Sequence, residues 1–224
     1  MANENVTNET AINKAMANPS ETKTPLIYQA TKYDCGPTTV VNALRFLYSR
    51  EELDPELLTE TYARTLDDFN EEGELGKYGT SHQAIRNVIR YFHAYGLGSG
   101  FPIDARAVRG EDVVMRPGAA AYDAIAHGAA GIARVWHAGH GHYILLSGVS
   151  EDGRLLAFDP SAAADTIDDT ARTEITDMPT IANRSIDPAV LNAAEADDYA
   201  LKNSKNADPT DPEIGEIGLI WRTA

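Results

Sequence analysis

The fold is decided by residues 29–48, which read QATKYDCGPTTVVNALRFLY. Apolar side chains recur there at the three- and four-residue spacing of a helix, at Val40, Leu44 and Leu47. Because this spacing places them on one face, a helix with a buried stripe is predicted over residues 35–48.

The start of this helix gives Cys35 a special electrostatic position. Asp34 is predicted as its N-cap, and Pro37 falls in the first turn, where a missing N–H costs little. A sulfur at this point meets the positive helix end and unpaired N–H groups, which favour a thiolate. Gly36 keeps the next position clear for a substrate carbonyl. The pattern is typical of acyl-transfer cysteine enzymes, whereas the alternative for a lone cysteine is a small buried hydrophobe.

Outward from this helix, the chain is expected to place helices first and strands after. Further helices are predicted at 55–65, from Thr80 or Ser81 to 92, and at 119–126, with a loop at 96–100. Strands are predicted at 131–136, 142–149 and 155–158, where the apolar period becomes extended. This order predicts an α+β fold rather than an alternating α/β fold.

His142 is the candidate general base. It opens the most apolar strand of the sequence, which continues as Tyr143-Ile144-Leu145-Leu146. A histidine at the edge of a buried sheet is held rigidly, as a general base must be.

Asp159, at the end of the following strand, is the candidate to orient His142, and two hairpin registers are open. A two-residue turn at Asp152-Gly153 puts Asp159 opposite Leu146, about 13 Å along the strand from His142 and too far to bond. A longer loop over 149–152 puts Asp159 opposite His142. The catalytic interpretation requires the longer loop; otherwise Asp159 only begins a turn.

Gln29 is the candidate oxyanion donor. It lies six residues before Cys35, so its side-chain amide is placed to donate to a developing oxyanion beside the Cys35 backbone N–H. The alternative is a solvated loop residue.

The composition excludes several classes of partner. The 224 residues include 19 Lys and Arg against 34 Asp and Glu, a net charge of −15, which repels phosphate backbones and anionic lipid. No apolar run approaches the ~20 residues of a membrane helix, and residues 1–24 lack a secretory signal. The single cysteine forbids an internal disulfide. We therefore expect a cytoplasmic protein with no nucleic-acid or membrane partner, and the oligomeric state stays open.

A metal site is not expected. Six histidines are present, and His137 and His140 lie in the glycine-rich run 136–141. No cysteine or acidic residue lies at ligand spacing from them, so no metal and no other cofactor is predicted.

Three regions are predicted along the chain. Residues 1–24 have no apolar period and are expected to form a mobile arm, and residues 25–160 form the core. Residues 161–224 form an acidic extension with 13 acidic and 5 basic side chains. The apolar stretch 214–221 is predicted to return as a closing strand.

Four short motifs together resemble the papain-like cysteine peptidases. They are Gln29, Asp34-Cys35-Gly36-Pro37, Gly141-His142-Tyr143 and Phe158-Asp159-Pro160. The resemblance is closest to the bacteriocin-processing group, which cleaves double-glycine leaders, and to its stand-alone relatives, and it covers about residues 26–160. It implies a papain-like α+β fold in which a helical N-terminal part packs on a C-terminal antiparallel sheet.

The resemblance also implies roles for the candidate residues. Cys35 would be the nucleophile, His142 the general base and then acid, Asp159 the orienting residue and Gln29 an oxyanion donor. The predicted function is a cysteine peptidase-like hydrolase that cleaves a peptide or small amide through an acyl-enzyme. Two alternatives stay open: a transpeptidase or acyltransferase with the same triad, and a catalytically silent binding module on this fold.

Overall fold

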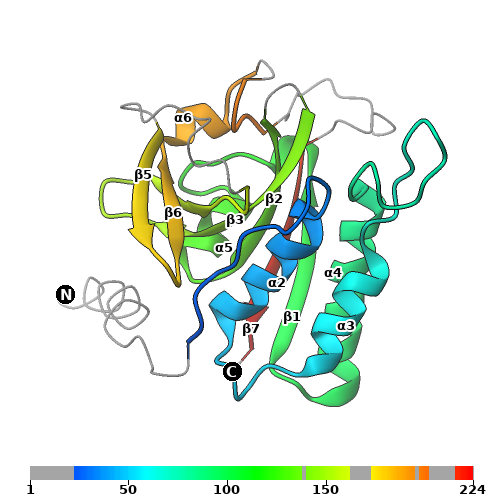
Figure 1. Cartoon of the computed structure of the whole chain (residues 1–224). Coiled ribbons are helices and arrows are strands. Elements are labelled where there is room, and N and C mark those ends of the chain that lie inside the picture. The colour runs from blue at the N-terminus through cyan, green and yellow to red at the C-terminus, as the bar shows by residue number, and fades with distance from the viewer. Residues whose placement is uncertain (1–22, 138–139, 162–172, 195–196, 202–214, 224) are drawn as a thin grey trace.

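A computed structural model describes residues 23–137, 140–161, 173–194, 197–201 and 215–223 (Figure 1). The predicted arm at 1–24 therefore lies almost wholly outside the described residues. The helices are α2 (Cys35–Leu47), α3 (Pro55–Arg64), α4 (His82–Ser99), the short 3₁₀ helix η1 (Gly110–Asp112), α5 (Ala120–Ala126) and α6 (Pro188–Leu191). The strands are β1 (Ile103–Arg109), β2 (Ala130–His137), β3 (His140–Val149), β4 (Leu155–Phe158), β5 (Thr173–Met178), β6 (Ala182–Ile186) and β7 (Glu216–Arg222).

All of these strands join one antiparallel sheet in the order β1-β7-β2-β3-β4-β6-β5. The last strand in the sequence, β7, lies inside the sheet between β1 and β2. Such a long-range pairing closes the fold only when the C-terminal residues are in place. Within the stretch 214–221 predicted as a closing strand, the described residues from Glu216 onward belong to β7.

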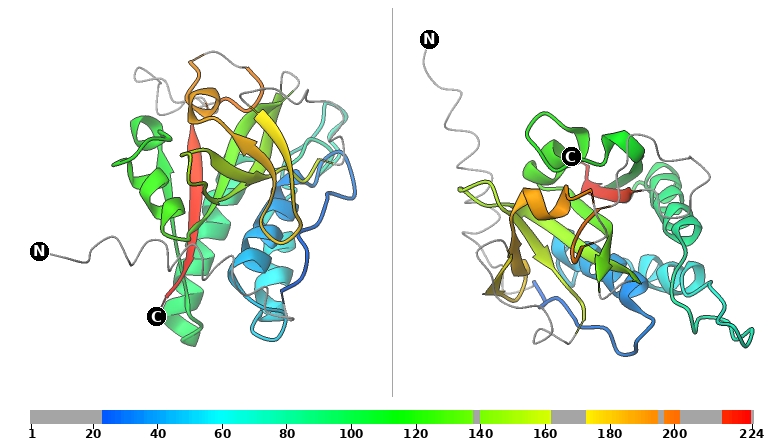
Figure 2. Two further views of the ribbon diagram at one scale, coloured as in Figure 1. Left: turned by 90° about the vertical axis from the view of Figure 1, so that its left-hand side faces the viewer. Right: turned by 90° about the horizontal axis from the view of Figure 1, so that it is seen from above.

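Helices cover the sheet on both faces. On one face, α2 packs on β2 and β3 while α4 packs on β1 and β7, with α3 beside α4. On the other face lies α5, as the left view of Figure 2 shows. Successive residues of β3 serve the two layers alternately: Leu145 packs with Val40 and Leu44 of α2, and Ile144 packs with Ile125 of α5. The α+β prediction is confirmed.

The predicted loop at 96–100 is wrong for most of its length. Helix α4 continues to Ser99, and Gly100 ends it in the left-handed region at φ 74°, donating its N–H to Gly96 O. Gly96 permits a close helix–strand approach rather than breaking the helix, because a Cβ there would overlap the carbonyl oxygen of Ile103 at the start of β1.

Three strands were not predicted. Strand β1 forms one edge of the sheet, and its sequence IDARAVR alternates apolar and charged residues over 103–107, so a period of two is present and was missed. Strands β5 and β6 end the sheet at the other edge. Together with β7 they come from residues 161–224, so the part predicted as an extension supplies three strands of the common sheet.

Candidate active site

The loop before α2 is held by the carboxylate of Asp34. Its Oδ2 accepts from the Ala30 N–H at 3.0 Å, and its Oδ1 accepts from the N–H and the hydroxyl of Thr31, each at 2.7 Å. Asp34 occupies the predicted N-cap position, but its side chain makes no capping bond because it turns back to this loop. The first helical bond uses its backbone oxygen instead, which accepts from Thr38 N–H at 3.0 Å. The loop and the tip of α2 are thus fixed to each other.

Cys35 is the first residue of α2 and is only 9% exposed. The next residue is glycine for a steric reason, since a Cβ on Gly36 would lie 2.5 Å from Thr80 Oγ1. The space that the sequence suggested for a substrate carbonyl at Gly36 is therefore bordered by Thr80.

A buried hydrogen bond connects the helix of Cys35 to the strand of His142. Thr39 Oγ1, one turn into α2, donates to the carbonyl oxygen of Tyr143 at 3.0 Å. Because both groups are buried, this bond fixes the distance between helix and strand.

His142 lies between Cys35 and Asp159. Its Nε2 is 2.7 Å from Asp159 Oδ1, and its ring lies close enough to Cys35 for the sulfur to help raise the pKa of His142. Since Nε2 is engaged by the carboxylate, Nδ1 is the nitrogen left for the thiol. His142 is 4% and Asp159 2% exposed. The fold thus brings three residues, 107 and 17 positions apart in sequence, into one buried cluster.

The surroundings of His142 and Asp159 favour a charged imidazole beside a charged carboxylate. Burial alone disfavours a charged imidazole, but the bond to Asp159 and the nearby Cys35 outweigh it and raise the pKa of His142 above its ordinary value. Burial likewise opposes an ionised Asp159, yet the bond from His142, with the Ser161 N–H and the Tyr199 hydroxyl, holds the pKa of Asp159 below its usual range. At neutral pH the pair is therefore an imidazolium and a carboxylate.

Neither predicted hairpin register is present. The turn has three residues, Glu151–Gly153, with Ser150 N–H donating to Arg154 O and Gly153 at φ 83°. A bulge between Leu146 and Gly148 then shifts the pairing, and Leu145 lies opposite Phe158. Continued by one residue, this register sets Asp159 opposite Ile144. Asp159 reaches His142 diagonally across the strands, so the predicted contact is present although both predicted alignments are wrong.

Gln29 lies beside the segment that follows Asp159. Its backbone N–H donates to Pro160 O at 2.8 Å, and its side-chain amide donates to Thr31 O at 2.7 Å. That bond uses one of the two amide hydrogens, and the buried Oε1 has no hydrogen-bond partner among the described residues. The structure connects Gln29 to the same loop as Asp34, and its role as an oxyanion donor stays a prediction.

Two further residues hold Asp159 and were missed from the sequence. Asn183 Oδ1 accepts from the Asp159 N–H, and its Nδ2 donates to the Asp159 carbonyl oxygen, both at 2.8 Å. The Tyr199 hydroxyl donates to Asp159 Oδ2 at 2.8 Å. Both residues follow the stretch that carries the resemblance. No local periodicity indicates them, because only the pairing of β4 with β6 and the return of the later chain bring them near.

His137 also lies close to His142, with ring centres 5.1 Å apart. Burial and the neighbouring His142 lower the pKa of His137, which favours the neutral ring there. Among the described residues, no group of three or more His, Cys, Asp or Glu side chains could hold a metal ion. No helix in the described part of the chain is both long and apolar enough to cross a membrane.

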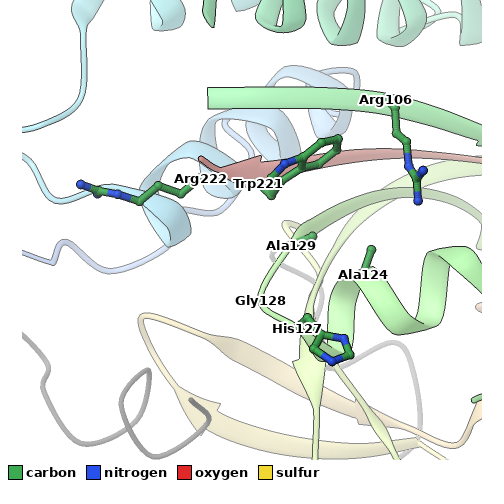
Figure 3. Close-up of a pocket in the computed structure, with 7 residues that line it drawn as sticks. All are labelled: Arg106, Ala124, His127, Gly128, Ala129, Trp221 and Arg222. Atoms are coloured by element: carbon green, nitrogen blue, oxygen red, sulfur yellow. The ribbon is translucent and has the colours of Figure 1, made fainter. Parts of the chain in front are cut away.

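Two surface hollows lie apart from this cluster. One, of about 510 Å³, is formed by α5 and the strands β1 and β7, and its lining includes His127, Trp221 and Arg106 (Figure 3). The other, of about 450 Å³, lies between α4 and β1. Neither hollow is lined by Cys35, His142 or Asp159, so neither gives access to the cluster that these three residues form.

Comparison with known proteins places the chain in a family. Among solved structures, the peptidase domain of Streptococcus mutans ComA is similar at 16% sequence identity, over 62% of this chain and 80% of that chain, with a TM-score of 0.34. No curated protein matches. The model of the Peptidase_C39-like family matches residues 21–178. This match spans most of the chain and agrees with the papain-like, bacteriocin-processing resemblance seen in the sequence. The chain therefore belongs to the Peptidase_C39-like family.

Proposed function

We propose that the protein is a cysteine hydrolase that cleaves a peptide or small amide through Cys35, His142 and Asp159. Family membership supports a peptidase-like chemistry. The observation that carries the proposal is the His142 ring, which bonds Asp159 at 2.7 Å and lies beside Cys35 at the tip of α2. This is the arrangement of nucleophile, base and orienting group that acyl transfer requires.

In the proposed reaction, the Cys35 sulfur attacks the amide carbonyl carbon and forms a carbon–sulfur bond. The carbonyl electron pair moves to oxygen, where the Cys35 backbone N–H and the Gln29 amide are the candidate donors. The His142 imidazolium then gives its proton to the leaving nitrogen as the carbon–nitrogen bond breaks. Neutral His142 then takes a proton from a water molecule, whose oxygen forms a bond to the acyl carbon. The carbon–sulfur bond breaks, which releases the acyl group as a carboxylic acid and restores the Cys35 sulfur and the His142 imidazolium. Asp159 keeps its charge and orients the ring throughout.

Turnover of a fluorogenic peptide–amide library tests this proposal. Release of the fluorophore by the wild type is expected to disappear in Cys35→Ala and in His142→Ala. His93→Ala, an exposed histidine on α4, is the matched control and should keep full activity. A wild-type mass increase by one acyl group at Cys35, trapped by rapid acid quench, would identify the intermediate. Equal release by wild type and Cys35→Ala would contradict the proposal.

A silent binding module is the second candidate, and the low exposure of Cys35 favours it. A side chain that is 9% exposed needs an opening before a substrate carbonyl can reach it. If the binding-module candidate is right, the same peptides bind without turnover, and their affinity is unchanged in Cys35→Ala.

An acyltransferase with the same triad is the remaining alternative. Product analysis with an added amine distinguishes it from a hydrolase, because an acyltransferase would give an amide rather than an acid.

A further inference from the structure

The carboxylate of Asp159 is held at both oxygens. Oδ1 faces His142 at 2.7 Å and accepts from the Ser161 N–H at 2.8 Å, and Oδ2 accepts from the Tyr199 hydroxyl at 2.8 Å. Tyr199 is 1% exposed. Because donors act on both oxygens, the carboxylate has little freedom to rotate about its Cβ–Cγ bond.

A buried cation lies near the hydroxyl of Tyr199. Arg184 of β6 acts electrostatically on Tyr199, and its guanidinium has no acceptor that could compete for the hydroxyl hydrogen. The single hydroxyl hydrogen is given to Asp159. Arg184 is 2% exposed and also donates to the Asn183 carbonyl oxygen at 2.8 Å. Burial and the nearby Asp159 raise the pKa of Tyr199, so the hydroxyl stays protonated and keeps donating.

The backbone around Tyr199 is fixed next to strand β2. Its N–H donates to Trp136 O at 2.8 Å, and Ala200 O accepts from Trp136 N–H at 3.0 Å. Segment 197–201 is thereby fixed to Trp136 near the end of β2. The residue before Trp136 is Val135, which lies opposite His142 in the sheet. Tyr199 has φ 67°, a left-handed conformation that costs energy for a tyrosine and persists only where the surroundings impose it.

We propose that Tyr199 is a positioning residue that fixes the Asp159 carboxylate toward His142, so that a C-terminal segment completes the active site. The proposal rests on the proposed function and adds a residue outside the part of the chain that the family model matches, 21–178. A phenylalanine would fill the same volume, so the hydroxyl, rather than the ring, carries the role.

The first test measures the site without any substrate. The His142 ring is titrated by nitrogen-15 NMR in full-length wild type, Tyr199→Phe and Tyr48→Phe. Tyr48 is the matched control. It is a buried tyrosine at the C-cap of α2, the end of the helix away from Cys35, and its hydroxyl donates to Pro102 O at 2.8 Å. When the Asp159 carboxylate is free to turn away, the His142 pKa should fall by about one unit or more, the scale of one hydrogen bond to a charged group. A fall in Tyr199→Phe alone is expected; an unchanged or raised value overturns the proposal.

The second test is a double-mutant cycle on peptide–amide turnover. Tyr199→Phe should lower kcat about tenfold with KM unchanged, and should have no further effect in an Asp159→Ala background. Equal losses in both backgrounds would show that the tyrosine only packs, and would overturn the proposal. If the wild type does not hydrolyse the library, the proposed function fails, while the titration of His142 still decides the role of Tyr199.

Discussion

Asp159 bonds the His142 ring at 2.7 Å although the strand register sets it opposite Ile144. The two side chains lie on the same face of neighbouring strands, two positions apart along the ladder, and the bond runs diagonally. A diagonal bond depends on where each side chain is anchored as well as on the register. This explains why the backbone of Asp159 is clamped by Asn183 on both its N–H and its carbonyl oxygen.

The His142–Asp159 pair predicts a defined pH dependence of stability. The pKa of His142 is raised, so its contribution is complete below the unfolded value of ~6.5 and is lost as the pH rises toward the folded value. The pKa of Asp159 is lowered, so its contribution is complete above ~3.9 and is lost in acid.

His142→Gln should therefore lower the free energy of unfolding most between these limits, by about 3 kcal/mol. The difference from wild type should shrink as the pH rises above neutral. Urea titrations at closely spaced pH values measure it, and a difference that stays constant up to pH 9 would contradict the ion pair.

The contact between Gly36 and Thr80 predicts a steric penalty. Gly36→Ala places a Cβ 2.5 Å from Thr80 Oγ1 and 2.6 Å from Thr80 Cβ, so it should cost about 1–3 kcal/mol of stability. Thr80→Gly removes the obstacle but also the hydroxyl that accepts from Leu66 N–H at 3.2 Å. The double variant is expected to lose less than the sum of the single variants, as measured by urea unfolding. Strict additivity would show that the two side chains do not collide.

If Gln29 is an oxyanion donor, its removal should affect kcat rather than KM. Gln29→Ala should lower kcat by about 10²-fold and leave KM near the wild-type value, because an oxyanion donor acts only as charge develops on the carbonyl oxygen. The matched control is Gln83→Ala, which removes an exposed amide on α4. A raised KM with unchanged kcat would assign Gln29 to substrate binding instead.

The bond from Thr39 to Tyr143 predicts a link between packing and activity. Thr39→Val removes a buried bond between α2 and β3, whereas Thr61→Val removes a buried bond inside α3, from Thr61 Oγ1 to Leu57 O at 2.7 Å. Each should cost about 1 kcal/mol of stability. Only Thr39→Val is expected to lower kcat, since it alone loosens the helix of Cys35 from the strand of His142. Equal activities of the two variants would speak against that coupling.

The sequence predicts the parts of the fold and site that depend on local patterns. The apolar spacing after Cys35 gives α2, and the apolar run after His142 gives β3, so the nucleophile and base candidates follow from their neighbours. The bulge between Leu146 and Gly148 could not be foreseen, because β3 contains the continuous apolar run Tyr143–Leu146, which has no alternation whose phase could reveal an extra residue.

The remaining differences come from tertiary contacts. Gly96 looks like a helix end in the sequence and instead permits the approach of Ile103. Strand β1 is an exception, because residues 103–107 alternate apolar and charged side chains and so indicate a strand. Tyr199 lies in an acidic stretch with no period, and its place beside Asp159 arises only when segment 197–201 pairs with Trp136. Sequence patterns thus indicate the reacting residues better than the residues that hold them.

The rate of Cys35 alkylation by iodoacetamide, followed across pH by intact mass, tests the central claim most directly. A sulfur beside a buried imidazolium should react faster in the wild type than in His142→Ala, most clearly at neutral pH and below. If wild type and His142→Ala give the same curve across the pH range, the cluster of Cys35, His142 and Asp159 is not a nucleophilic site.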